Sequence, residues 1–341
     1  MEELSKRKEQ ILAVLTEAYI QTGEPVGSKG IMEKLGGTVS SATIRNEMAE
    51  LHEMGYLMQP HTSAGRIPTA KALRLYIDHL MQPSTLPEET CREIDAELEK
   101  ASDPETLMET ASSILSRETG CATITTAPQE QTAIIRKMEM IPISSHAVAL
   151  LMMTGTGAVH TRVCRLLIPI QEETFAKLSE VLAGYFSRRP LSEIGLPQVQ
   201  SLLVKMGSDA LACAPIVTAA YEMVKESVDT DVRFKGQLNL LRNPDYEPER
   251  IHNLLGFLSE QGRLSQLLQS HTGGLRVVFG DESRTPELDG TSLIVTHYTP
   301  HGGNGTIGLI GPQRMRYDVA IPTLEYMALA VSRVFDQFME E

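Results

Sequence analysis

The alternation of apolar and polar positions predicts two helices at the start of the chain. Residues 4–20 place apolar side chains at helical spacing, and Gly23 with Pro25 follows as a helix-ending pair. A short second helix is expected over residues 29–35, with Ser28 as its N-cap and a glycine pair after it. This pattern indicates a small helical unit.

A third helix is predicted to follow Ser40 or Ser41, either of which can cap it. Helical spacing places a buried stripe at Ile44, Met48 and Leu51. The other side presents Ala42, Arg45, Asn46 and Ala49. Small side chains let a backbone approach a surface, and the amides and partial positive charge of a helix N-terminus suit a phosphate.

A basic hairpin is expected after this helix. Gly55 ends the helix, and an apolar strand begins at residues 56–58. Residues 59–77 contain no acid, and their basic side chains are His61, Arg66, Lys71 and Arg74. Such a hairpin would contact a phosphate backbone. Three helices followed by a hairpin are typical of a winged helix-turn-helix that binds DNA, although small helical domains of this order also bind proteins.

Two residues of the third helix have the side chains best suited to reading bases. The guanidinium of Arg45 matches guanine, and the carboxamide of Asn46 matches adenine in a major groove. The candidate DNA-contacting residues are Ser40, Ser41, Thr43, Arg45, Asn46, His61, Arg66 and Lys71.

The rest of the chain alternates between helical and strand patterns. Residues 81–89 contain two prolines and little that can pack, which predicts a linker and a first domain that moves semi-independently. Acidic helices are expected at residues 88–100 and 104–118. Strands are then predicted at residues 122–126, 133–141, 147–153 and 158–167.

A mostly helical block interrupts the strands. It spans residues 171–270, and within it residues 234–241 could pair as a strand or hairpin. Strands resume at residues 275–279, 292–297 and 306–310, and a helix over residues 322–338 closes the chain. A sheet interrupted in this way predicts one α+β domain with an inserted subdomain.

Charge is distributed unevenly. The 341 residues are 42% hydrophobic, enough for two or three domain cores, and carry a net charge of −13. Residues 1–82 hold nine Lys or Arg and ten Asp or Glu, whereas the remainder holds 22 and 34. DNA affinity must therefore depend on where the first domain's cations lie.

The remaining composition points to a cytoplasmic protein. Four widely spaced cysteines predict reduced core thiols. The N-terminus is charged, and the longest wholly apolar run, residues 147–153, is far shorter than the roughly 18 residues of a membrane span.

Nothing in the sequence recommends an enzyme, a cofactor or a metal. The glycines at residues 303–308 match a dinucleotide-loop spacing, but they run into a strand with no βαβ unit after it. Arg314 and Arg316 could hold an anion, although an internal salt bridge is the favoured interpretation. The nine histidines show no metal-binding spacing, and no nucleophile elbow occurs.

Four motifs carry a resemblance to a known family. The run SSATIRNEMAELHEMGYL followed by QPHTSAGRIPT resembles the heat-inducible transcription repressors called HrcA, as do LNLLRNPDY at residues 238–246 and IGLIGPQRMRY at residues 307–317. The resemblance implies a dimeric repressor of chaperone operons that binds an inverted-repeat operator, with the chaperonin GroEL as modulator.

The resemblance also implies a domain plan. A winged-helix domain would occupy residues 1–82 and a linker residues 83–89. A GAF-like domain would combine residues 90–170 with 271–341, and an inserted dimerisation subdomain would occupy residues 171–270. The alternatives are a GAF-type regulator that senses a metabolite and a pure chaperone-binding adaptor, which would need no basic wing.

Overall fold

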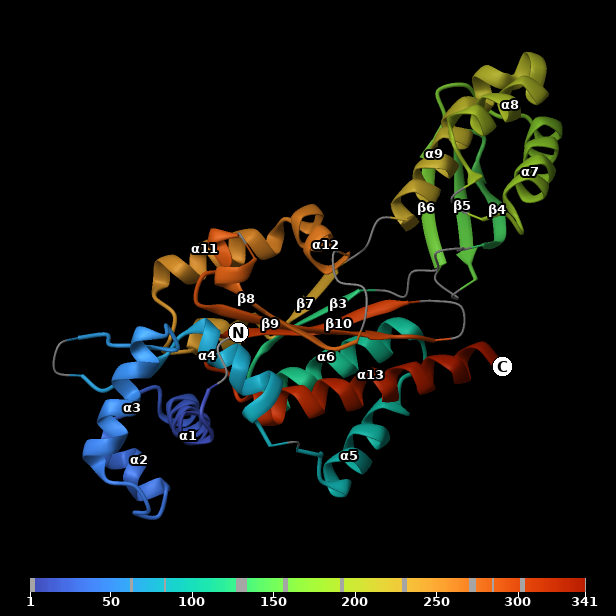
Figure 1. Cartoon of the computed structure of the whole chain (residues 1–341). Helices are drawn as coiled ribbons and strands as arrows, with labels where there is room; N and C mark the ends of the chain where they lie inside the picture. Colours follow the sequence, from blue (N-terminus) through green and yellow to red (C-terminus); the bar gives the residue numbers. More distant parts are fainter. Residues whose placement is uncertain are drawn as a thin grey trace.

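The computed structural model contains an N-terminal helical domain, a central five-stranded sheet with helices on both faces, and a separate lobe (Figure 1). It describes residues 4–61, 64–82, 84–126, 134–155, 159–190, 193–228, 232–269, 274–283, 285–300 and 304–340. Residues 62–63 of the predicted hairpin and Gly303 of the glycine-rich segment lie outside this part of the chain.

The N-terminal domain has the predicted order of three helices and a hairpin. Its elements are α1 (Lys6–Thr22), α2 (Ser28–Lys34), α3 (Ser41–Glu53), β1 (Leu57–Met58), β2 (Ile67–Pro68), α4 (Ala70–Leu75) and the π-helical turn η1 (Tyr76–Leu80). One apolar core joins α1, α2 and α3 to β1. The winged-helix prediction is therefore confirmed at the level of the fold.

Single capping residues mark where the helices of this domain begin and end. Ser5 caps α1, and Gly23 ends it with a φ of 72°, which glycine tolerates without strain. Ser40 caps α3, accepting from the Thr43 amide at 3.1 Å. The expected Ser28 cap was wrong: Gly27 is the N-cap of α2, and the Ser28 hydroxyl contacts the Ser41 hydroxyl at 2.9 Å.

The central sheet is antiparallel, in the order β7-β3-β10-β9-β8. Helices α6 and α13 cover one face, and α11 and α12 cover the other (Figure 1). The strands are therefore apolar on both sides. The elements of this body are α5 (Glu88–Leu98), α6 (Pro104–Thr119), β3 (Ala122–Thr126), β7 (Val232–Lys235), α10 (Gln237–Arg242), α11 (Pro248–Ser259), α12 (Gln261–Gln269), β8 (Arg276–Phe279), β9 (Thr291–Tyr298), β10 (Gly305–Pro312) and α13 (Tyr317–Glu340), with short 3-10 turns η4 (Gly280–Glu282) and η5 (Pro286–Leu288).

The lobe has its own sheet, in the order β4-β5-β6, and its own core. Helices α7 and α9 pack on one face of that sheet. On the other face Ile141, Ala149 and Val163 lie side by side, and Ile141 and Val163 are 47% and 62% exposed. Its elements are β4 (Ile135–Ser144), β5 (Ala147–Thr154), β6 (Val159–Arg165), α7 (Glu172–Phe186), α8 (Leu196–Met206), the 3-10 turn η3 (Gly207–Asp209) and α9 (Ala210–Val228).

The boundaries of this lobe differ from the expected insertion at residues 171–270. Strands β4 to β6 pair only with one another among the described strands, so the lobe begins near residue 134. It ends near residue 228, because β7 pairs with β3 and α10 to α12 pack on the central sheet. The segment 234–241 divides into the end of β7 and helix α10.

The last helix starts earlier than predicted. Helix α13 begins at Tyr317 and contains Pro322, which lacks an amide hydrogen and leaves the Asp318 carbonyl without its usual helical partner. The Ser84 hydroxyl donates to that carbonyl at 2.6 Å. The linker thus supplies a donor to the carbonyl that Pro322 leaves without a helical partner, and the helix continues through the proline.

One helical stretch, Val199–Ser227, is long and apolar enough to cross a membrane by composition alone. In the described fold, Leu202, Ile216 and Ala220 from this stretch belong to the core of the lobe.

In this structure the N-terminal domain packs against the central body. Ile20, Leu73 and Tyr76 belong to the same apolar core as the central sheet. The Arg74 guanidinium donates to the Val277 carbonyl at 2.7 Å and pairs with the Glu282 carboxylate. A proline-rich linker therefore connects two parts that share a core.

A second cation fixes the same junction. Arg314 forms an ion pair with Asp245 at 2.6 Å and donates to the Ile20 carbonyl at 3.4 Å. A Cβ at Gly23 would lie 2.7 Å from the Arg314 guanidinium carbon, so the end of α1 approaches this side chain closely. The favoured interpretation of Arg314 as a structural ion pair is therefore confirmed.

Candidate nucleic-acid interface

Helix α3 presents one face to the domain core and the other to solvent. Ile44, Met48 and Leu51 are buried, as predicted. The exposed residues on the other side are Ala42, Arg45, Asn46 and Ala49. Among the described residues, Arg45 forms no ion pair, so its guanidinium is available to a partner of opposite charge.

The N-terminal end of α3 is held in place by hydroxyl groups. Ser40 is exposed, and its side chain contacts both the amide and the hydroxyl of Thr43. Ser41 instead joins α3 to α2 through Ser28. Helix geometry leaves the first amides, those of Ser41 and Ala42, without intrahelical acceptors. This end can therefore accept a phosphate, with Ser40 and Thr43 beside it and Ser41 in a structural role.

The wing is fixed at its base by the backbone of Arg66. Its amide and carbonyl bond to Val26 at 3.0 and 2.9 Å. A Cβ at Gly65 would lie 2.5 Å from the Val26 carbonyl oxygen, so only glycine allows this approach. The half-buried Arg66 side chain thus starts from a rigid base, and His61 lies exposed at the other end of the described hairpin.

Lys71 and Arg74 do not belong to the wing. Both lie in α4, and Arg74 is bound to the central body. The Lys71 ammonium donates to the Met54 carbonyl at 2.9 Å and lies 4.2 Å from the centre of the Tyr56 ring. Lys71 therefore satisfies a carbonyl at the C-terminal end of α3, where a cation also complements the helix dipole.

Two further cations of this domain, Arg7 and Lys8, form ion pairs with acids on α3. Sequence reasoning did not predict these pairs. Lys8 pairs with Glu47 at 3.3 Å and with Glu50 at 2.8 Å, and Arg7 approaches Glu47 at 3.6 Å. The hydrogen bond to Glu50 is the main cause of a raised Lys8 pKa. The sequence did indicate an acidic side of α3, because Glu47 and Glu50 are three residues apart and therefore lie on the same side of the helix.

Residues of the glycine-rich segment, of the arginine pair and of the histidines have local partners in the fold. Residues Gly305–Pro312 form a central strand, as expected for a glycine-rich sheet segment. Arg316 donates to both carboxylate oxygens of Asp318, at 2.9 and 2.7 Å. His297 lies 3.3 Å from the Thr306 hydroxyl, and the described residues contain no group of three or more potential metal ligands.

From its position in the wing, we expect Arg66 to contribute to DNA binding that does not depend on base sequence. Replacing Arg66 with alanine should weaken operator and random DNA nearly equally, and should flatten the dependence of log affinity on log salt by about one unit. Lys71→Ala should change that slope less, because its ammonium is already bound to Met54. Salt titrations of both variants measure this; a loss confined to the operator in Arg66→Ala would show a base contact instead.

Two family models match the chain. A winged helix-turn-helix model, the DNA-binding part of the HrcA transcription repressor, covers residues 3–80. A model for the C-terminal domain of HrcA covers residues 105–321.

Individual relatives agree over nearly the full length. The heat-inducible transcription repressor HrcA of Syntrophobacter fumaroxidans is 34% identical over 99% of both chains. Its counterpart in Lachnoclostridium phytofermentans is 31% identical over 98% of both. A solved structure described as a hypothetical protein is 25% identical, with a TM-score of 0.64 over 98% of this chain and 99% of that one. The chain therefore belongs to the HrcA family of heat-inducible transcription repressors, which are not enzymes.

Proposed function

We propose that this repressor acts in the cytoplasm as a homodimer on an inverted-repeat operator upstream of chaperone operons. Each subunit places α3 in one of two successive major grooves, so that occupied DNA excludes the transcription machinery. The observation that carries the proposal is the exposed side of α3, opposite the buried stripe, where Arg45 and Asn46 are both exposed and Arg45 has no competing ion pair in the described chain.

We propose that the lobes of two subunits associate with each other through an apolar surface of the lobe. A groove of about 530 Å³ is lined by Leu167, Ile168, Leu211, Ala212, Ala214, Pro215, Thr218, Ala219 and Glu222. Leu167 and Leu211 are 96% and 74% exposed. Apolar side chains this exposed mark an interaction surface, and self-association through a shared groove gives the two-fold symmetry that an inverted repeat requires. The central sheet with its helices would be the GAF-like domain.

Footprinting on the organism's own chaperone promoters tests the operator assignment. A symmetric protected site, with two halves separated by one helical turn or a multiple of it, is expected. Protection that is asymmetric, or absent from every chaperone promoter, would contradict the proposal.

We further propose that heat releases the operator because the repressor is marginally stable and depends on the chaperonin GroEL for its binding-competent form. The chain has no Trp, 5% aromatic residues and a net charge of −13 that repels itself in the compact state. When the competent fraction falls, apparent affinity falls in proportion, so a small loss of stability opens the promoter.

Purified GroEL with its nucleotide should therefore raise operator binding in a gel-shift assay and delay its loss on warming. The reason is that the chaperonin returns non-native chains to the competent pool. Bovine serum albumin at equal mass is the control for non-specific protection. Operator affinity unchanged by GroEL over the whole temperature range would exclude this mechanism and leave the DNA-binding assignment intact.

A further inference from the structure

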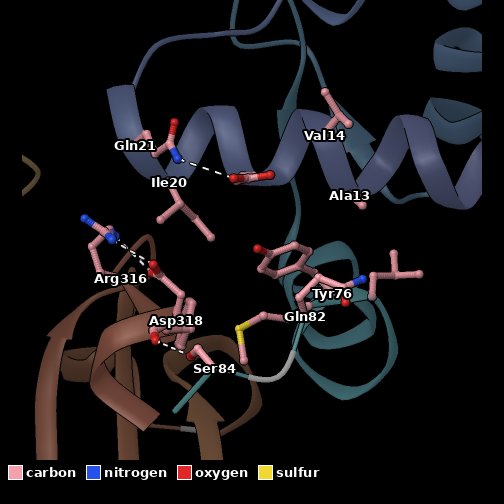
Figure 2. Close-up of a pocket in the computed structure, with 13 residues that line it drawn as sticks. Ala13, Val14, Ile20, Gln21, Tyr76, Gln82, Ser84, Arg316 and Asp318 are labelled. Atoms are coloured by element: carbon pink, nitrogen blue, oxygen red, sulfur yellow. Dashed lines mark hydrogen bonds and ion pairs between the residues drawn. The ribbon is translucent and has the colours of Figure 1, made fainter. Parts of the chain in front are cut away.

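A cavity of about 380 Å³ lies where the N-terminal domain packs on the central body. Figure 2 shows its walls: α1 on one side, Tyr76 and Gln82 on another, and Arg316 with Asp318 on a third. The DNA-facing side of α3 contributes nothing to this lining. The cavity is therefore separate from the nucleic-acid interface.

The floor of the cavity is apolar. Ile20 and Tyr76 are 6% and 8% exposed, and Val14, Leu80 and Met81 continue the same wall. This floor can accept a short hydrocarbon body or a ring, and the volume is within the range of small-molecule pockets.

The lining of the cavity carries excess negative charge. Its ionised lining residues are Glu17, Asp318 and Arg316, and Arg316 is already bound to Asp318 through two hydrogen bonds. In the described part of the chain, the exposed Glu17 carboxylate accepts one long hydrogen bond, from the Gln21 amide at 3.4 Å. Glu17 is therefore the group that a ligand can still neutralise.

Tyr76 lines the same cavity as both acids. Burial raises the pKa of Tyr76 to about 12, and the charges of Glu17 and Asp318 contribute to the increase. The negative potential that disfavours a tyrosinate here favours a cation, and the Tyr76 ring offers it an aromatic face.

We propose that this cavity binds a small organic ammonium compound, with its protonated amine at Glu17 and its apolar body over Ile20 and Tyr76. The ligand contacts both the N-terminal domain and the central body. It therefore binds the docked arrangement and stabilises it against the undocked one.

Three probes with the same six-carbon chain test the chemistry of the head group: hexylammonium, hexanol and hexanoate. Calorimetry on the full chain should show saturable 1:1 binding of hexylammonium, at least about fivefold tighter than hexanol, with hexanoate weakest. Absence of saturable binding, or equal affinity for the three probes, would overturn the proposal.

Two charge-neutralising variants locate the site. Glu17→Gln should reduce the affinity for hexylammonium about fivefold, to the level of hexanol, whereas Glu24→Gln should not change it. Glu24 is an exposed carboxylate just after α1 and does not line the cavity. Equal losses in the two variants would mean that the net negative charge of the chain, not this cavity, attracts the probe.

Arg74→Ala tests the link to docking. Arg74 lies outside the cavity but holds the N-terminal domain on Val277 and Glu282. Loss of these contacts should weaken hexylammonium binding severalfold if the site needs both domains in place. Unchanged affinity in a variant shown by proteolysis to have released its linker would contradict that dependence.

Discussion

Arg45→Ala is expected to remove about 1–3 kcal/mol of operator binding and to relax the preference for one base pair, while affinity for random DNA changes little. The reason is that Arg45 is exposed on the outer side of α3 and has no ion pair within the described chain. Asn46→Ala should behave in the same way at a neighbouring position. Competition binding against operators with single base changes measures both effects.

Arg92→Ala provides the matched control. It removes the same charge from α5, where the side chain is 77% exposed and, among the residues that the structure describes, pairs only with the exposed Glu88 at 3.4 Å. This variant should bind operator and random DNA like the wild type. If Arg45→Ala weakened both kinds of DNA equally, Arg45 would be a phosphate contact and α3 would not read bases through it.

Removing the lobe is expected to have the largest effect. Thr126 and Val232 lie opposite each other in the β3-β7 pair, so residues 127–231 can be replaced by an Asn-Gly turn that makes this pair a hairpin. The product should be folded but monomeric, and its operator affinity should fall by about 10²–10⁴, because the second half-site contact is no longer intramolecular. Sedimentation and operator titration measure the two effects.

A point variant separates dimerisation from folding. Leu211→Glu changes a groove residue that is 74% exposed, and Leu329→Glu changes a residue of α13 that is 71% exposed and does not line the groove. The first should dissociate the dimer and the second should not. An intact dimer in both Leu211→Glu and the chain without its lobe would place the interface elsewhere.

Local sequence signals predicted the helices of this protein well. Ser40 at the start of α3 and Gly23 at the end of α1 act through their own hydrogen bonds and backbone angles, so a single sequence suffices to place them. The exposed side of α3 followed from helical spacing for the same reason.

Sheet partners were not predictable in this way. Strand β7 pairs with β3 across more than 100 residues, whereas β4 to β6 form a second sheet, and strands of both sheets are rich in β-branched and apolar residues. The residues of a strand do not determine which other strand it pairs with. The predicted insertion therefore begins and ends about 40 residues later than the lobe in the structure.

The roles of charged residues were the other limit. Lys71 and Arg74 looked like wing residues because they follow the hairpin without an intervening acid, but one binds the end of α3 and the other binds the central body. Their partners lie 17 or more residues away in sequence, and for Arg74 in another domain. The number of Lys and Arg residues in a segment does not show which of these side chains are already bound within the protein.

Whether this repressor binds its operator as a dimer can be measured by titrating the wild-type chain with a duplex that carries the full inverted repeat and with a duplex that carries a single half-site. A dimer that spans both half-sites should bind as two chains per full operator, and its affinity for the half-site should be weaker by about 10²–10⁴. Binding of one chain per full operator, with equal affinity for the half-site, would contradict a dimeric repressor that places two α3 helices on one site.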